Sequence, residues 1–185
     1  MKKLKKIILL LIVVMGWCGY YYHATANDLK DLSEIEQKVL FVYIDVNTAY
    51  VETYEGYYID NEGNVFSFDL AHLDKNEEEK LYKLGYPSYL ATMDNSKLFA
   101  TVDKKKLLKY YNKLLKVNED AKIKSKCGGD DMGTETFYGV LPHEDGSLNM
   151  VRLYSKGDTD SYNTDRNAKK IAKWLKRHPH KLIKK

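Results

Sequence analysis

Hydrophobic and polar positions recur with different periods along the chain, and each period predicts a different element. Residues 39–46 (VLFVYIDV) are almost continuously apolar and rich in β-branched and aromatic side chains, which is typical of a buried strand. Residues 49–60 are expected to form a second strand that pairs with residues 64–70. The intervening Asn-Glu-Gly segment, residues 61–63, favours a tight turn because its glycine reaches positive φ at little cost.

Residues 75–84 carry the signals of a helix at both ends. Asp74 occupies the N-cap position, Glu77 stands at the capping-box offset, and Gly85 follows the last turn. A shorter helix is expected within residues 28–38, where apolar side chains recur every three positions.

Two further predicted helices combine an apolar stripe with many cations. One is expected over residues 104–117 with Asp103 as its cap, the other over residues 165–177 with Asn163 or Thr164 as its cap. The apolar positions of the first are Leu107, Leu108, Tyr111, Leu114 and Leu115. Those of the second are Ala168, Ile171, Ala172 and Leu175, with Trp174 beside them.

Three more strands are expected in the second half of the chain. Residues 121–127 alternate strictly, which predicts one wet face and one buried face. The buried face would carry Ala121, Ile123 and Cys127. Residues 134–141 and 147–154 predict a hairpin around the Asp-Gly turn signal at 145–146, with Leu141 opposite Leu148.

Together these elements predict an α+β fold, in which an antiparallel sheet built from hairpins has two or three helices packed on one face. No repeat, low-complexity tract or Pro/Gly/Ser-rich linker interrupts residues 27–185, so we expect them to form a single domain.

The first 26 residues are interpreted separately, as a leader. Four lysines precede nine consecutive apolar residues, 7–15, which is the pattern of a secretory signal peptide. The Ala24-Thr25-Ala26 segment fits a cleavage site, so the working protein is expected to begin at Asn27. Two alternatives stay open. Cys18 resembles the lipid-modified cysteine of bacterial lipoproteins in its position, although Trp17 precedes it, and an uncleaved leader would anchor the chain in the membrane.

Charge changes the picture once this leader is set aside. Residues 27–185 hold 26 basic and 26 acidic side chains and are therefore neutral overall. The charge is uneven, however, because residues 27–79 carry a net −11 and residues 80–185 a net +11. This asymmetry indicates either two halves that attract each other within one fold or a basic surface for a polyanion.

The chain lacks the common catalytic signatures, including G-x-S-x-G, H-E-x-x-H, a P-loop and C-x-x-C. Cys127 is the single cysteine after residue 26, so it cannot form a disulfide within the cleaved chain, and we interpret it as a buried structural thiol rather than a nucleophile. The catalytic residues are accordingly unknown, and no organic cofactor is expected.

Two candidate sites follow from charge. In the predicted hairpin register Asp131 faces Asp158, so carboxylates at the loop ends are a candidate calcium site made of Asp130, Asp131, Asp158 and Asp160. The acid-free stretch after residue 165 is a candidate polyanion-binding surface made of Arg166, Lys169, Lys170, Lys173, Lys176 and Arg177. A third feature, five tyrosines between residues 43 and 58, indicates either strand formation or an aromatic binding face.

The richness in lysine, isoleucine, tyrosine and asparagine is typical of an AT-rich bacterial genome. We therefore expect an exported bacterial protein, secreted or held at the outer face of the cytoplasmic membrane. Its most favoured function is non-enzymatic binding to an anionic cell-envelope polymer, a lipid surface or another exported protein, with nucleic acid disfavoured because no recognition motif is present. An envelope-acting hydrolase and a membrane-tethered sensory domain are the alternatives.

Overall fold

The computed structural model describes residues 28–47, 53–94, 96–118, 121–127, 133–143, 145–157 and 159–177. The chain divides into two compact units, Met1–Lys30 and Asp31–Lys185. The predicted signal peptide and its cleavage site lie outside the described residues. The fold below is that of the second unit.

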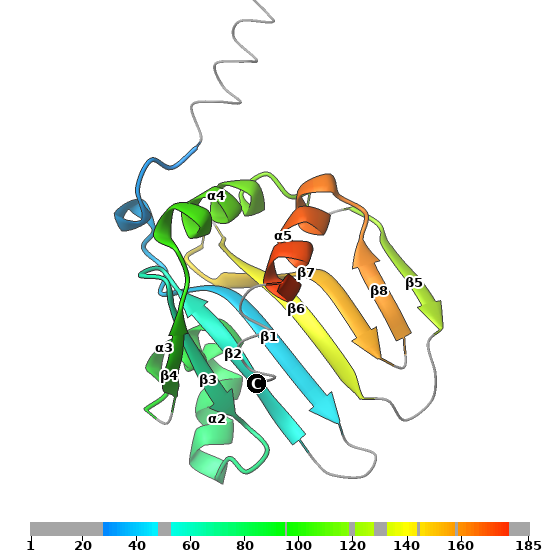
Figure 1. Cartoon of the computed structure of the whole chain (residues 1–185). Coiled ribbons are helices and arrows are strands. Elements are labelled where there is room, and N and C mark those ends of the chain that lie inside the picture. The colour runs from blue at the N-terminus through cyan, green and yellow to red at the C-terminus, as the bar shows by residue number, and fades with distance from the viewer. Residues whose placement is uncertain are drawn as a thin grey trace, which may run out of the picture. The chain divides into compact units, whose positions relative to one another are not determined.

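The described part of this unit contains one eight-stranded sheet with the strand order β4-β3-β2-β1-β6-β7-β8-β5 (Figure 1). The strands are β1 (Val39–Asn47), β2 (Thr53–Asp60), β3 (Asn64–Asp69), β4 (Lys97–Thr101), β5 (Ile123–Cys127), β6 (Thr134–Pro142), β7 (Leu148–Gly157) and β8 (Thr159–Asn163). The helical elements are η1 (Leu32–Glu34), α2 (Lys75–Leu84), α3 (Tyr86–Thr92), α4 (Lys104–Leu114) and α5 (Arg166–Arg177). Every neighbouring pair of strands is antiparallel.

Strand β1 lies in the middle of the sheet because its sequence is apolar on both faces. It pairs with β2 on one side and β6 on the other, and its residues from Val39 to Ile44 are all buried. A strand that is buried on both faces needs a covering layer on each side. The two layers are formed by different helices.

Helices α4 and α5 cover the face that carries Phe41 and Tyr43 (Figure 1). The indole ring of Trp174 in α5 meets the Phe41 ring edge to face, with centroids 5.4 Å apart. Gly139 of β6, which pairs with Phe41, lies directly beneath Leu114 of α4, and a Cβ there would overlap the Leu114 side chain. The missing side chain at position 139 therefore lets α4 approach the sheet closely.

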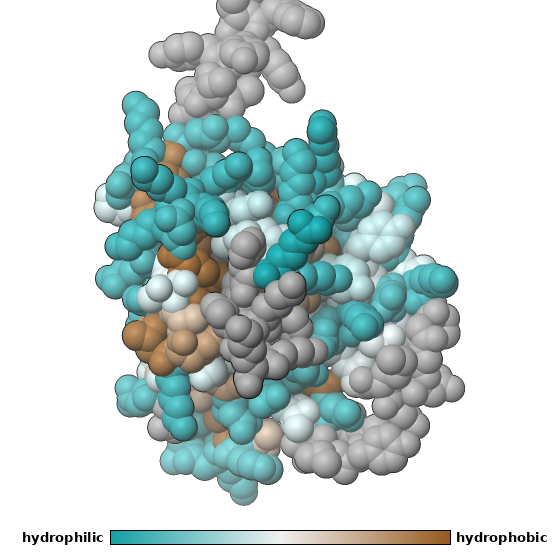
Figure 2. All heavy atoms as spheres, viewed as in Figure 1, coloured by the Kyte–Doolittle hydropathy of each residue, from teal (hydrophilic) through white to brown (hydrophobic). Residues whose placement is uncertain are grey.

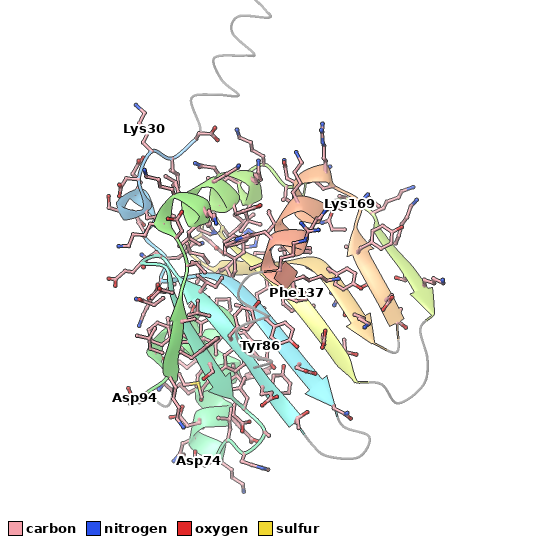
Figure 3. All side chains as sticks on the ribbon, viewed as in Figure 1. Lys30, Asp74, Tyr86, Asp94, Phe137 and Lys169 are labelled. Atoms are coloured by element: carbon pink, nitrogen blue, oxygen red, sulfur yellow. The ribbon has the colours of Figure 1, made fainter. Side chains whose placement is uncertain are left out.

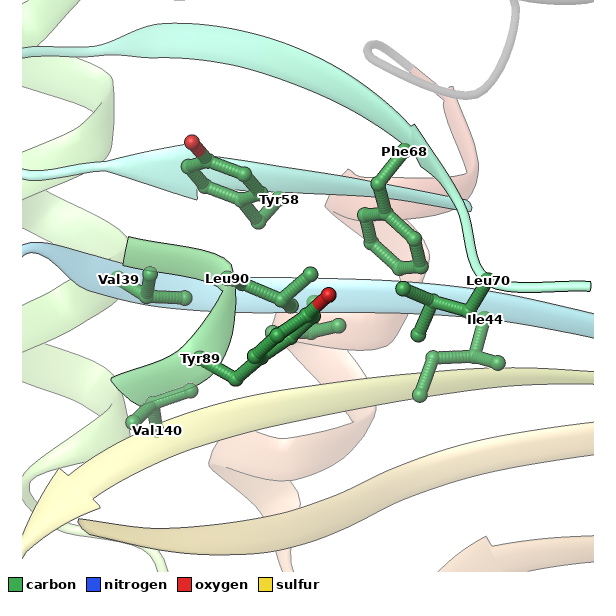
Figure 4. Close-up of a cluster of buried hydrophobic side chains, with 9 residues drawn as sticks. Val39, Ile44, Tyr58, Phe68, Leu70, Tyr89, Leu90 and Val140 are labelled. Carbon is green, nitrogen blue, oxygen red and sulfur yellow. The ribbon is translucent and has the colours of Figure 1, made fainter. Parts of the chain in front are cut away.

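Helix α3 covers the opposite face, which carries Val42 and Ile44 (Figure 4). Tyr89 and Leu90 of α3 are buried in a cluster with these two residues and with Tyr58 of β2. The other buried members are Val39, Phe68, Leu70 and Val140. Helix α2 packs on α3 and has no fully buried residue of its own.

The predicted α+β class with an antiparallel, hairpin-built sheet is confirmed. Four α-helices are present in the described part, and they divide between the two faces instead of sharing one. Helix α3 and strands β4 and β8 were not predicted from the sequence. Each is a short element of five to seven residues, and such lengths carry little periodicity.

The predicted caps Asp74 of α2 and Asp103 of α4 are confirmed, and the predicted cap of α5 is wrong. The Asp74 carboxylate accepts hydrogen bonds from the N–H groups of Asn76 and Glu77, and Gly85 follows α2 with φ 74°. At α5 the cap is Asp165, which accepts from Asn167 and Ala168 at 2.6 and 3.0 Å. The predicted cap Asn163 instead accepts a hydrogen bond from the Asp165 N–H, and so fixes the turn that precedes the helix.

Several predicted boundaries and registers are corrected by the structure. The helix expected within residues 28–38 is only the 3-10 turn η1, and the described part of the second strand begins at Thr53. Helix α4 ends at Leu114, three residues earlier than predicted. The β6–β7 hairpin forms, but Leu148 pairs with Pro142 and Leu141 pairs with Asn149, a shift of one residue. Ile123 is 42% exposed because β5 is an edge strand, so its predicted burial is wrong, whereas the predicted burial of Cys127 concerns a side chain that the structure does not describe.

Candidate functional site

Helices α4 and α5 lie side by side on one face of the sheet and are joined by an aromatic contact. The ring of Tyr110 in α4 stacks on the indole of Trp174 in α5, with centroids 4.3 Å apart and planes 7° apart. Trp174 is buried, so this contact fixes the distance between the two helices from beneath.

Helices α4 and α5 together carry a dense set of cations, which we call the basic layer, and the carboxylates of Asp103 and Asp165 cap their N-termini. Its cationic residues are Lys104, Lys105, Lys106, Lys109, Lys113, Arg166, Lys169, Lys170, Lys173, Lys176 and Arg177. Neither helix contains Asp or Glu. Figure 2 shows hydrophilic side chains over this part of the molecule. Such an arrangement sums to a positive field over one surface.

Helix α5 turns its predicted polyanion-binding residues outward because its other side is buried. Ala168, Ile171, Ala172, Trp174 and Leu175 are the buried positions. Arg166, Lys170, Lys173 and Arg177 are exposed and follow one another at spacings of four, three and four residues. They therefore form a single ridge along the helix.

Two of the predicted cations turn back toward the sheet. The Lys176 Nζ lies 2.9 Å from the centroid of the Tyr154 ring, and the Lys169 Nζ lies 5.6 Å from the centroid of the Tyr162 ring. Burial lowers the pKa of Lys176, while the carboxylates of Asp160 and Glu135 act in the opposite direction. Lys176 thus contacts the sheet through the Tyr154 ring, and its predicted part in polyanion binding stays a prediction.

The lysines of α4 were not among the predicted site residues, although the sequence held the necessary signal. Residues 104–117 contain six lysines and no acid, and residues 166–177 contain four lysines, two arginines and no acid. The sequence does not show that these two helices are neighbours, which the structure establishes through contacts such as the Tyr110–Trp174 stack.

The acidic residues gather in a different region. A cavity of about 1180 Å³ is lined by six carboxylates, which come from β1, β2, β3, α2 and the neighbouring loops. No residue of α4 or α5 is among its described lining. The carboxylates are Asp45, Glu55, Asp69, Asp74, Glu77 and Asp94. Figure 3 places Asp74 and Asp94 at the opposite end of the unit from Lys169. Lys80 and Lys97 also line this cavity, and the carboxylates of Asp160 and Glu135 act on Lys176 of α5, so the charges of the described residues are separated only in part.

The predicted calcium site is only partly within the described residues. Asp130, Asp131 and Asp158 lie outside them, and the register that placed Asp131 opposite Asp158 is shifted by two residues at the described end of the hairpin, where Thr134 pairs with Gly157. Asp160 is described, and its Oδ1 accepts the N–H of Gly157 at 3.3 Å. Within the described ranges no group of three His, Cys, Asp or Glu residues is arranged to hold a metal ion. The calcium site stays a prediction.

The tyrosines of the first strands are mostly core residues. Tyr43, Tyr57 and Tyr58 are buried, and the Tyr57 hydroxyl has no hydrogen-bond partner among the described residues. Burial raises the pKa of Tyr57 far above the usual tyrosine value. Tyr54 is half-buried and Tyr50 is outside the described residues, so the aromatic binding face does not form as one surface from the described tyrosines.

Among the helices that the structure describes, none combines the length and the apolar character that a membrane crossing requires. Comparisons with protein-family models, with curated proteins and with solved structures found no match to this chain.

Proposed function

We propose that this chain is an exported bacterial binding module, without catalytic activity of its own, and that its basic layer binds an anionic polymer of the cell envelope. The observation that carries the proposal is the concentration of cations on two adjacent helices. Helices α4 and α5 hold eleven cations and no Asp or Glu between their first and last residues.

A purely structural role explains this arrangement poorly. Like charges on neighbouring helices repel one another, and this repulsion lowers the stability of the folded chain. The outward ridge of Arg166, Lys170, Lys173 and Arg177 makes no contact that the packing of α5 requires, since the buried side of the helix supplies that packing. A bound polyanion would remove the repulsion.

The apolar side of α5 favours a polymer over a lipid bilayer. An interfacial helix binds lipid by burying its apolar face between the headgroups. In α5 this face, including Ile171, Trp174 and Leu175, is already buried against the protein. Only the charges are available to a ligand, so binding should be electrostatic and should weaken steeply as salt is added.

The experiment measures binding of the chain to immobilised poly(glycerol phosphate) at several salt concentrations. The test variant is Lys170→Gln with Lys173→Gln, which removes two charges from the exposed ridge of α5. The matched control is Lys75→Gln with Lys83→Gln, which removes two exposed charges from α2 on the other face of the sheet. We expect the first pair to weaken binding by roughly tenfold and to reduce its salt dependence, and the control to change neither.

Equal losses in the two double variants would show that net charge, not the basic layer, governs binding, and would overturn the proposal. Vesicles that contain phosphatidylglycerol serve as the second probe. Retention of the chain on these vesicles without binding to poly(glycerol phosphate) would replace the polymer by a lipid surface as the partner.

A further inference from the structure

The face of the sheet opposite the basic layer is covered by α3 at one end and holds a groove at the other. This groove has a volume of about 400 Å³ and is lined from six strands, β1, β2, β5, β6, β7 and β8. Its volume lies at the lower end of the range of small-molecule sites. Ile44 and Val46 of β1 mark its floor on the side of the apolar core.

A row of hydroxyl side chains crosses the groove from strand to strand. In the sheet register Thr136 pairs with Ser155, Ser155 pairs with Ser161, and Ser161 pairs with Ser125. All four line the groove, and we call them the hydroxyl row. Because paired strands lie about 4.8 Å apart, the row presents hydroxyls at regular intervals on one surface.

The inner part of this row is built into the sheet and its outer part is open. Thr136, Ser155 and Ser161 are only 5 to 6% exposed, whereas Ser125 on the edge strand is exposed. The hydroxyls of Thr136 and Ser155 share a hydrogen bond of 2.9 Å. Each hydroxyl has one donor and two acceptor lone pairs, so one shared bond leaves a donor and several lone pairs for a ligand.

Two tyrosines and one arginine border the hydroxyl row. Tyr54 stacks on Tyr86 of α3, and their hydroxyls are hydrogen-bonded, which holds the Tyr54 ring in place. Tyr138 pairs across the strands with Arg152, and both line the groove. Among the described lining residues Arg152 is the one charged side chain, and it is exposed.

We infer that this groove binds a sugar unit that carries a carboxylate. A sugar ring offers hydroxyls that both donate and accept, as the hydroxyl row does, and its C–H face packs on a tyrosine ring. A carboxylate accepts two parallel hydrogen bonds from a guanidinium, which Arg152 supplies at the open side. The proposed function places a strongly anionic polymer on the basic layer, on the other face of the sheet. Sugar binding in the groove therefore does not depend on that proposal.

The alternative is that the hydroxyls only stabilise strand pairing. Cross-strand Ser and Thr contacts contribute to sheet stability without any ligand. That explanation accounts for the bond between Thr136 and Ser155 but gives no part to Arg152, an exposed cation that also lines the groove. A binding experiment separates the two.

The probes are glucuronic acid and glucose, which differ at one carboxylate, and the readout is the set of amide shifts of the 15N-labelled protein in an NMR titration up to tens of millimolar. We expect both sugars to shift amides around Thr136, Ser155 and Ser161, with glucuronic acid binding roughly tenfold more tightly. Arg152→Gln should remove the preference for glucuronic acid. Arg177→Gln, the same change on the basic layer, should leave that preference intact.

The combined variant Thr136→Val with Ser155→Ala tests the hydroxyls themselves. It removes both partners of one hydrogen bond, so no unsatisfied group is left and the fold should persist. It should abolish the response to both sugars while the remaining spectrum stays folded. An absence of shifts at the groove, or shifts confined to α4 and α5, would overturn the inference. A failure of the chain to bind poly(glycerol phosphate) would contradict the proposed function but not this inference.

Discussion

Tyr110 and Trp174 stack with their ring centroids 4.3 Å apart, and this contact makes one layer of two helices that lie about sixty residues apart in the sequence. The sheet supports the contact from below, where the Phe41 ring meets the edge of the same indole. This aromatic pair therefore contributes, with the other contacts between the two helices, to the spacing of the cations on α4 relative to those on α5.

Replacement of Tyr110 by leucine tests this dependence. Leucine keeps an apolar side chain against Trp174 but loses the stacked pair, so we expect a loss of about 1 kcal/mol in the free energy of unfolding. Binding to poly(glycerol phosphate) should weaken although no charge is changed. Urea unfolding and the binding assay measure the two effects, and unchanged affinity in a destabilised variant would show that the helices keep their spacing without the stack.

Gly56 and Gly85 should both resist replacement by alanine, for different physical reasons. A Cβ on Gly56 in β2 would overlap the carbonyl oxygen of Tyr43 on the paired strand, and it would also press on the Phe68 ring. Gly85 has φ 74° but no neighbouring atom within 4 Å of the added carbon. We expect each alanine to cost about 1 to 3 kcal/mol of stability in chemical unfolding, Gly56→Ala through overlap with its neighbours and Gly85→Ala through its backbone, because φ 74° with ψ 159° is a conformation that favours glycine.

Stability should fall as the pH rises above 10, because buried tyrosines cannot ionise in the folded state. Burial raises the pKa of Tyr111 to about 12, whereas the ordinary value is 10.0. Between these two values the unfolded chain releases the proton first, so each increase in pH favours unfolding. Below pH 10 both states keep the proton, and this group then contributes no pH dependence.

Tyr111→Phe removes the titrating hydroxyl at this position, and the loss of stability between pH 10 and 12 should become smaller. Urea midpoints measured from pH 8 to pH 11 give the comparison. Tyr82, which is 94% exposed, provides the control, since its replacement by phenylalanine should leave the alkaline slope unchanged. Equal slopes for the wild type and Tyr111→Phe would contradict the expectation.

The calcium prediction can be tested without further structural knowledge. If the loop acids bind calcium, millimolar calcium should raise the melting temperature of the intact protein, because a ligand that binds only the folded state stabilises it. Asp131→Ala with Asp158→Ala should abolish this rise. No rise in the intact protein would end the hypothesis.

The start of the working protein is a separate prediction. N-terminal sequencing and the intact mass of the protein from a bacterial host should show a chain that begins at Asn27 in the medium. A lipidated Cys18 or an intact leader in the membrane fraction would instead make the tethered alternatives correct, and would change which polymers the basic layer can reach.

Elements whose signals are local could be predicted from the amino-acid sequence alone. The capped helix after Asp74, the helix after Asp103, the hairpin turn at residues 61–63 and the apolar strand β1 could all be predicted, because side-chain periodicity and capping act over a few neighbouring residues. The cations of α5 were equally visible as a run without acids.

Which of these elements contact one another depends on the tertiary structure and could not be predicted. The neighbourhood of α4 and α5, the one-residue shift in the β6–β7 register and the retreat of Lys176 onto Tyr154 all depend on contacts between distant residues. The hydroxyl row is the strongest case, since Thr136, Ser155, Ser161 and Ser125 come from four strands whose order in the sheet differs from their order in the chain. Pairing across a sheet is set by the burial of whole faces, and no local pattern at a serine reveals the hydroxyl that will lie beside it.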